Sequence, residues 1–427
     1  MPLYPKIFRL RQHFERPLVE DIPAEVDTQL ATLSLGQKIK PGHTVAITAG
    51  SRGIANIAVI IKAIVDHLKG FGAEPFIVPA MGSHGGGTAE GQTQIINDYG
   101  VTEDFCGCPI KASMETIVVC EAKERFPVHF DKYASEADHV VVVGRIKPHT
   151  NFTGDIESGL MKMMLIGLGK HNGAIVYHRA IKDYNFGQIV RSVSREVLSK
   201  CGVIAGVGIV ENSYDETAKI AAVAPQEFEE REKELLLTAK KWMPRLPFDS
   251  ADLLFVDEIG KNISGTGLDT NVVGRKFGFH SAGPDETPKI RYISVRGLTE
   301  ETHGNGTGIG IAEIALTRAI EKLDDKITRI NCITGGSPIG AMHPIDFGTD
   351  RELLDTMLPG IGLTDPIDAK LMWIQDTLHV SELEVSAAYL EEARERSDLE
   401  ILSDPRPLPF DEKNMLPDVK TLAQRLV

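Results

Sequence analysis

The sequence predicts an α/β protein of two domains, each built on a sheet of mainly parallel strands. Its 427 residues exceed one typical domain of about 150 residues and suit two. Short β-rich runs alternate with amphipathic stretches along most of the chain, which is typical of βαβ units. The stretch PRLPFD at 244–249 interrupts this alternation. We therefore place one domain at 1–247 and the other at 250–405.

The first domain is expected to hold buried strands that end in glycine- or proline-marked loops. Apolar runs of four to eight residues predict these strands, and apolar residues at helical spacing predict the helices between them. The predicted strands are 44–48, 75–80, 139–143 and 203–210, and the predicted helices are 55–68, 89–99 and 225–242. Thr88 is the expected N-cap of the second helix.

The second domain repeats the alternation. Strands are expected at 251–256, 290–295 and 327–333, and helices at 309–323 and 382–396. The last of these helices is predicted from a capping box formed by Ser381 and Glu384. A proline-rich linker follows at 404–409, and we expect a final helix within 410–427 to pack back on the first domain.

Composition excludes several classes of partner. The net charge of −14 disfavours nucleic acid, whose phosphates repel an acidic chain. No polybasic run, no apolar run near the ~20 residues of a membrane span and no secretion signal occurs in the sequence. The five cysteines lack metal or redox spacing. We expect a cytoplasmic protein with reduced cysteines, and a homo-oligomer is left open.

Three polar side chains follow the predicted strands of the first domain. Arg52 comes after the first strand, His84 after the second and His149 after the third. Ligands of parallel sheets gather at the carboxyl ends of strands, and arginine can hold a carboxylate through two hydrogen bonds. Taken singly, each residue could equally be a surface or loop side chain. Together they predict a site at this edge.

Two further residues stand in apolar surroundings. Lys162 lies between two methionines, and His178 follows an apolar run. Lys162 is either a surface lysine or a desolvated amine suited to covalent attachment of a cofactor. His178 is either a packed core histidine or a metal ligand. No familiar motif decides between these alternatives. The segment 167–171 resembles a phosphate-binding loop, but His171 stands where that loop needs Ser or Thr.

The order of these segments resembles the nickel-pincer-nucleotide-dependent lactate racemase family. The resemblance covers about the first 180 residues: an arginine loop, then Gly82-Ser83-His84-Gly85, then Lys147-Pro148-His149 with Phe152 and Gly154, then a lysine and a histidine. It implies two α/β domains with the active site in the cleft between them. It also implies a racemase or epimerase acting on a 2-hydroxy acid.

The resemblance further implies a cofactor and roles for individual residues. The cofactor is the pyridinium-3-thioamide-5-thiocarboxylic acid mononucleotide with nickel, supplied by cofactor-synthesis enzymes, to which the substrate reversibly transfers a hydride. Lys162 would attach it, His178 would bind nickel, and Gly82, Ser83 and Gly85 would contact the nucleotide. His84 and His149 would be the two acid/base groups, one for each enantiomer's hydroxyl. Arg52 would hold the substrate.

The chain departs from the family pattern in two places. The gap from His149 to Lys162 is 13 residues, where the family has roughly ten, so Lys170 is the next candidate for attachment. In the segment 267–276, Val273 and Gly274 replace a Tyr-Gln pair and are followed by Arg275 and Lys276. We expect the two basic residues to contact a substrate larger than lactate.

Two other functions are kept as alternatives. A zinc or manganese hydrolase would use His84, His149 and His178 as ligands, because imidazole nitrogens suit both catalysis and metal binding. A non-catalytic homologue would bind a mononucleotide without turnover.

Overall fold

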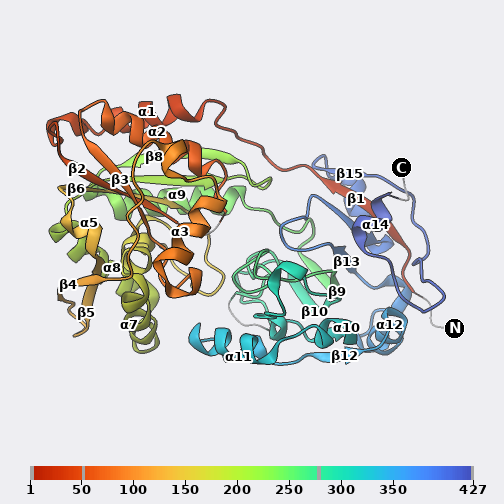
Figure 1. Ribbon diagram of the computed structural model, residues 1–427. Helices are drawn as coiled ribbons and strands as arrows, with labels where there is room; N and C mark the ends of the chain where they lie inside the picture. The colour runs from red at the N-terminus through yellow and green to blue at the C-terminus, as the bar shows by residue number, and fades with distance from the viewer. Residues whose placement is uncertain (1–3, 51–52, 277–279, 425–427) are drawn as a thin grey trace. The chain divides into compact units, whose positions relative to one another are not determined.

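The computed structural model describes residues 4–50, 53–276 and 280–424. The chain divides into two compact units. The N-terminal unit comprises residues 15–243, and the C-terminal unit comprises residues 1–14 together with 244–427. Figure 1 shows both units and labels many of their elements.

A five-stranded sheet forms the centre of the N-terminal unit. Its strand order is β3-β2-β6-β7-β8, and all neighbours are parallel except β7 and β8. The strands are β2 (Thr44–Ala49), β3 (Glu74–Pro79), β6 (His139–Arg145), β7 (Val203–Glu211) and β8 (Thr217–Val223). The four strands that the sequence predicted in this unit are confirmed.

Helices cover both faces of this sheet. Val45 and Ile47 of β2 point into one apolar cluster with α1 (Ile22–Ala31) and α2 (Ile57–Lys69). Ala46 points into a second cluster with α7 (Lys170–Asp183), α8 (Phe186–Lys200) and α9 (Phe228–Trp242). This alternation along a strand buried on both faces explains the nearly continuous apolar runs in the sequence.

The remaining elements of the N-terminal unit are short, apart from the helices on the second face. They are α3 (Ala89–Asp98), α4 (Glu103–Cys106), β4 (Thr116–Glu121), β5 (Pro127–Asp131), α5 (Lys132–Glu136), α6 (Leu160–Lys162), α7 (Lys170–Asp183), α8 (Phe186–Lys200) and α9 (Phe228–Trp242). A π-helical turn, Met163–Gly167, joins α6 to α7. Thr88 caps α3 as predicted, accepting from the N–H of Gly91.

The C-terminal unit is built on an eight-stranded mixed sheet of order β12-β11-β10-β9-β13-β14-β1-β15. The pairs from β12 to β13 are parallel and those from β13 to β15 antiparallel. Its strands are β1 (Ile7–Gln12), β9 (Ser250–Val256), β10 (Lys289–Val295), β11 (Ile314–Leu316), β12 (Ile345–Phe347), β13 (Leu371–Ile374), β14 (Glu382–Ser386) and β15 (Leu399–Ile401). Its helices are α10 (Thr317–Glu321), α11 (Asp325–Thr334), α12 (Asp350–Met357), α13 (Leu390–Glu395) and α14 (Val419–Gln424). The predicted α/β class is confirmed.

Three element predictions in the C-terminal unit are wrong. The predicted strand 327–333 is helix α11, capped by Asp324. The predicted helix 309–323 contains strand β11 between two short helical turns. The segment expected to open a helix at Ser381 is strand β14, because it pairs with β1 and β13.

Strand β1 and helix α14 both lie in the C-terminal unit, whereas the sequence led us to expect them with the N-terminal domain. Strand β1 pairs with β14 and β15. Helix α14 places Val419 and Leu422 in an apolar cluster with Leu253 and Trp373. These apolar contacts, and the N–H of Val419 donating to Asp257 at 2.6 Å, fix the helix there.

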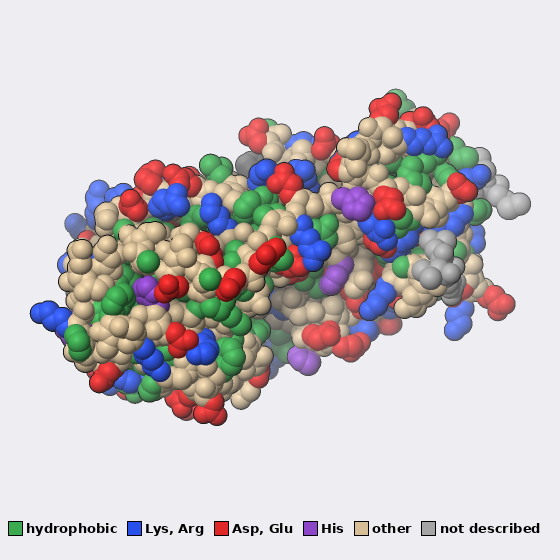
Figure 2. All heavy atoms as spheres, turned by 90° about the horizontal axis from the view of Figure 1, so that it is seen from above, with side chains coloured by type: hydrophobic (Ala, Val, Ile, Leu, Met, Phe, Trp, Pro, Cys, Tyr) green, Lys and Arg blue, Asp and Glu red, His purple; other side chains and the backbone are tan. Residues whose placement is uncertain are grey.

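None of the helices in the described ranges has the length and apolar character needed to cross a bilayer. On the face shown in Figure 2, Lys and Arg side chains are interspersed with Asp and Glu side chains, so neither sign of charge forms a continuous field there.

Candidate active site

The loops that follow β3, β2 and β6 leave the same edge of the N-terminal sheet. These strands are adjacent and parallel, so their carboxyl ends share one edge. His84 lies in the loop after β3 and His149 in the loop after β6. Arg52, in the loop after β2, lies outside the described residues.

The helical segment 160–183 passes close to this edge. Met163 reaches two of the strand ends, since a methyl group built on Gly50 would lie 3.3 Å from its Cε and one on Gly144 would lie 3.6 Å from it. A methyl group on Gly82 would lie only 2.9 Å from Cγ2 of Ile166. Gly82 therefore lets the His84 loop approach the segment that carries Lys162 and His178.

Lys162 and His178 are both half-buried. Sixteen residues of straight helix would separate them by about 24 Å, but the left-handed φ of +53° at Lys170 breaks the helix between them. Burial, and then the charges of Lys162 and Lys182, lower the pKa of His178. His178 is thereby held as the neutral imidazole that binds metals.

Lys170, the other attachment candidate, is fully buried. Its Nζ donates to the carbonyl of Pro79 at 2.5 Å and lies 3.1 Å from Oδ2 of Asp131. Burial lowers the pKa of Lys170 and raises that of Asp131. The contacts place the Lys170 amine inside the fold, which favours Lys162 for attachment.

An aromatic stack and a buried carboxylate support the His149 loop. The ring of His149 stacks on Phe152 at 4.3 Å between centroids, and Phe152 stacks on Phe186 at 4.5 Å. Glu157, fully buried, accepts the backbone N–H of His149 at 2.8 Å. Lys240 of α9 pairs with the same carboxylate at 2.7 Å.

The longer stretch between His149 and Lys162, where the chain departs from the family pattern, is anchored to the rest of the N-terminal unit. Asp155 accepts two hydrogen bonds of 2.7 Å from Arg191 of α8, and Glu157 anchors His149. Sequence reasoning missed both acidic residues as supports of the loop. The only signal was the local run Asp155-Ile156-Glu157-Ser158, whose partners lie far away in the sequence.

The His84 loop exposes its histidine and much of its backbone. Gly85, Gly86 and Gly87 have φ of +65°, +66° and +68°, a region that favours glycine. A methyl group on Gly86 would meet nothing within 4 Å. Such a backbone allows a nucleotide to approach closely, which fits the predicted roles of Ser83 and Gly85 in cofactor binding. Gly82 is buried against Ile166, and its predicted contact with the cofactor stays a prediction.

Glu232 of α9 is a second buried carboxylate beneath the site, and the sequence did not single it out. It is fully buried and accepts the N–H of Met161 at 2.8 Å, at the start of α6. Among the described residues its Oε1 has no hydrogen-bond partner. Burial raises the pKa of Glu232 to about 7.

The substrate-side residues predicted in the C-terminal unit have a different environment. Arg275 is fully buried, and its guanidinium contacts Glu313 at 2.8 Å and the carbonyl of Ile290 at 2.9 Å. This engagement is at odds with a substrate contact by Arg275, because its charge is already matched inside the fold. Lys276 is half-buried, and its role stays a prediction.

Val273 and Gly274 are both packed inside the fold. Val273 is fully buried. Gly274 has φ of +63°, and a methyl group there would lie 2.2 Å from the carbonyl oxygen of Pro288. The glycine is required by backbone packing, so only the missing hydrogen-bond donors of the Tyr-Gln pair remain as an argument about the substrate.

No three or more His, Cys, Asp and Glu side chains of the described residues are grouped so that they could hold a metal ion. His84, His149 and His178 therefore do not form the ligand set of the hydrolase alternative. A single histidine nitrogen, His178, fits a metal whose other ligands come from a cofactor.

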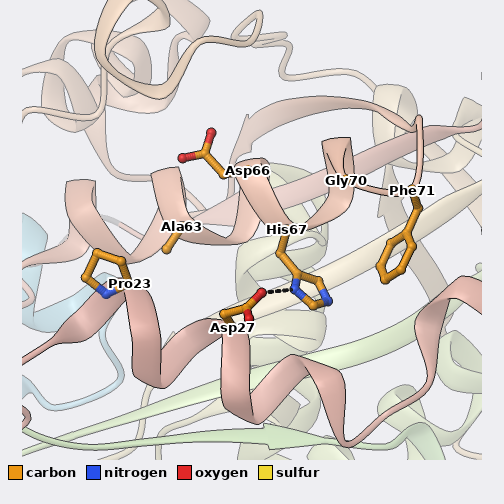
Figure 3. A pocket seen from close by; sticks show the side chains of 7 residues that line it. All are labelled: Pro23, Asp27, Ala63, Asp66, His67, Gly70 and Phe71. Carbon is orange, nitrogen blue, oxygen red and sulfur yellow. Dashed lines mark hydrogen bonds and ion pairs between the residues drawn. The ribbon is translucent and has the colours of Figure 1, made fainter.

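A surface pocket lies between α1 and α2 (Figure 3). It is lined by Pro23, Asp27, Ala63, Asp66, His67, Gly70 and Phe71. Nδ1 of His67 lies 2.7 Å from Oδ1 of Asp27. Gly70 and Phe71 follow α2 and precede β3, so this part of the pocket is at the amino edge of the sheet. We therefore do not place the active site there.

Comparison with known proteins covers the same loops. Residues 15–187 match the family model of the lactate racemase N-terminal domain. The chain is also similar to the solved lactate racemase apoprotein from Thermoanaerobacterium thermosaccharolyticum, with 14% identity, a TM-score of 0.53, and coverage of 87% of this chain and 94% of that one. No curated protein matches the chain. The structural likeness shows the fold, and the matched domain contains His84, His149, Lys162 and His178. Residues 15–187 thus match a lactate racemase N-terminal domain, and the chain shares the fold of a lactate racemase apoprotein.

Proposed function

We propose that this protein is an isomerase that racemises or epimerises a 2-hydroxy acid with a covalently held nickel-pincer nucleotide. The observation that carries the proposal is the common sheet edge: the His84 and His149 loops leave it, and the segment bearing Lys162 and His178 packs against it. The match of residues 15–187 to the lactate racemase N-terminal domain supports the reaction type.

The residues present fit the cofactor. The Lys162 amine would hold it covalently and the His178 imidazole would ligate its nickel, because that imidazole is kept neutral by its surroundings. When bound, the group supplies the acceptor for a hydride from the substrate's C2. The glycine backbone of the His84 loop would lie against the nucleotide.

The chain's own chemical task is proton transfer. The C2–H of a 2-hydroxy acid is too weakly acidic for a side-chain base, whereas its hydroxyl proton is within reach of histidine once the hydride is removed. His84 and His149 would each serve one enantiomer, taking the hydroxyl proton and returning it. Nδ1 of His149 accepts the N–H of Asn151 at 2.9 Å, so we assign the exchange to Nε2.

The substrate is proposed to be larger than lactate. Val273 and Gly274 provide no side-chain donors where lactate racemases carry a Tyr-Gln pair, and each lost hydrogen bond costs on the order of 1 kcal/mol. Arg52 and Lys276 are the proposed contacts for its carboxylate. Turnover of lactate should therefore be slow compared with branched, aromatic or polyhydroxy 2-hydroxy acids.

The test is intact-mass analysis of protein made in cells that synthesise the pincer nucleotide, followed by peptide mapping. We expect a covalent mass increase on Lys162 that Lys162→Ala abolishes. The purified, loaded enzyme should exchange deuterium at C2 or invert a 2-hydroxy acid. His84→Ala and His149→Ala should each retain the mass increase but lower turnover at least 100-fold.

Two results would contradict the proposal. A mass increase located on another lysine would remove Lys162 from its role. A fully loaded enzyme that inverts no 2-hydroxy acid in the panel would favour the non-catalytic alternative.

A further inference from the structure

A buried lysine and a buried glutamine join the His84 loop to the helix that follows Lys162. The Lys170 ammonium donates to the carbonyl of Pro79 and to Oε1 of Gln92 at 3.3 Å, and it forms an ion pair with Oδ2 of Asp131 at 3.1 Å. Lys170 and Gln92 are both fully buried. Neither group is used in the proton transfer proposed above.

The orientation of the Gln92 amide follows from its partners. Lysine only donates, so Oε1 faces Lys170, and carbonyls only accept, so Nε2 faces the loop. Nε2 donates to the carbonyl of Gly82 at 2.9 Å and to that of His84 at 3.3 Å. Gln92 thus links the buried ammonium to two backbone positions of the loop, one of them at His84 itself.

The loop needs such a link because its own sequence does not fix it. Gly82, Gly85, Gly86 and Gly87 all have positive φ, and glycine loses more conformational entropy on ordering than any other residue. The His84 side chain is exposed, so apolar packing does not hold it in place. The hydrogen bonds from Gln92 restrain the backbone on which it stands.

The buried ion pair of Lys170 and Asp131 is a poor means of stabilising the fold. Replacing a buried ion pair by apolar residues of similar volume is often neutral or stabilising. Lys170 also adopts φ of +53°, which is strained for a residue with a Cβ. Buried charge and backbone strain at one residue point to a positioning role.

We propose that Lys170 and Gln92 are positioning residues that set the His84 loop against the segment carrying Lys162 and His178. The inference rests on the proposed function for the meaning of His84. Its structural part, the restraint of residues 82–88, is measurable without cofactor or turnover.

The experiment compares Gln92→Met with Gln94→Met in the full-length chain. Both glutamines lie on α3. The Gln94 side chain is exposed, and its amide donates to Asp98 on the same helix. Amide hydrogen exchange should accelerate at least tenfold in residues 82–88 of Gln92→Met and remain unchanged elsewhere in the N-terminal unit. Gln94→Met should match the unchanged protein throughout.

Loaded enzyme supplies the second readout. Gln92→Met should lower kcat at least tenfold, change KM little, and retain the covalent mass on Lys162. Unchanged exchange in residues 82–88 would overturn the positioning role whatever the activity. If exchange in residues 82–88 accelerates but the loaded, unchanged protein turns over no 2-hydroxy acid, the positioning role stands and only the proposed function is contradicted.

A second variant covers the case in which Gln92→Met unfolds. The double variant Lys170→Met/Asp131→Asn removes both charges together, so no lone buried charge is left, and it keeps Gln92 without its anchor. Residues 82–88 should again exchange faster, by a smaller factor. Exchange equal to that of the unchanged protein would refute the role of Lys170.

Discussion

At the scale of single residues, the buried carboxylate of Glu232 fixes the start of the helical segment that carries Lys162. Glu232 accepts the N–H of Met161 at the first turn of α6, one residue before Lys162. A methyl group on Gly159 would lie 2.7 Å from Cδ of Glu232, so the carboxylate fills the space beside the chain there. Because the helix is so short, this contact holds the start of the segment that bears Lys162, the proposed attachment residue.

Glu232 should make stability depend on pH. Its pKa in the folded protein is about 7, raised from about 4.5, so folding favours its protonated form. The stabilisation is complete below pH 4.5 and is lost as the pH rises to 7. Relative to Glu232→Gln, the unchanged protein should lose on the order of 3 kcal/mol of unfolding free energy across that range. Urea titrations of both proteins at pH 4.5, 6 and 8 measure this, and parallel curves would contradict it.

The residues that the sequence predicted at the site are those that carry reactive groups in strand-end loops. His84 and His149 were visible because each follows a buried strand, and parallel strands bring such loops together. Glu157, Gln92 and Glu232 were not, because a carboxylate or amide acquires its role from a partner that folding alone supplies. The partner of Arg275 was not visible for the same reason, since Glu313 lies 38 residues away in the sequence.

At the scale of elements, the His84 loop provides a matched pair of glycines. Gly85 and Gly86 have nearly equal φ, so an added methyl group strains the backbone to a similar degree. At Gly85 it would also lie 2.5 Å from the carbonyl carbon of Gly91, whereas at Gly86 it would meet nothing within 4 Å. Alanine at Gly86 therefore tests backbone strain alone, whereas alanine at Gly85 tests strain together with a steric clash against Gly91.

We expect Gly86→Ala to cost about 1 kcal/mol and to retain most activity. Gly85→Ala should displace the loop from α3 and lower kcat at least 100-fold, with stability reduced further. Thermal unfolding and turnover of the two variants measured side by side decide this. Equal losses of activity would mean that the collision with Gly91 is not what orders the loop.

Elements were predicted correctly where the apolar residues of the sequence are the ones that the fold buries. They were predicted wrongly where apolar residues stay exposed. The strands of the N-terminal sheet are buried on both faces, so their apolar runs left little choice. The run at 327–333 is rich in isoleucine, yet Ile330 and Ile333 are exposed on α11 while Thr328 and Cys332 are buried. Here a polar N-cap and tertiary packing outweighed β-propensity.

At the scale of the whole chain, the N-terminal unit is an insertion into the C-terminal unit. Strand β1 precedes it and the other strands of the eight-stranded sheet follow it. The two ends of the insertion are joined, since Lys241 Nζ lies 2.9 Å from a carboxylate oxygen of Glu15. An inserted unit with neighbouring ends can fold without its host.

Fragments test this arrangement. Residues 15–243 produced alone should unfold cooperatively in urea. Residues 244–427 produced alone should not, because β14 and β15 would lack the strand between them. Adding residues 4–14 through a short linker before residue 244 should restore cooperative unfolding. A fragment 244–427 that is fully cooperative without β1 would contradict the dependence.

The position of β1 has a consequence for synthesis on the ribosome. Strand β1 is translated before the inserted unit, whereas its partners Glu382–Ser386 and Leu399–Ile401 are translated about 370 residues later. At roughly 5–20 residues per second this strand waits for tens of seconds with its backbone unpaired, while the inserted unit folds. Arg9 and Arg11 within it, which later pair with Glu382, give the waiting strand a charge that opposes premature association with other chains.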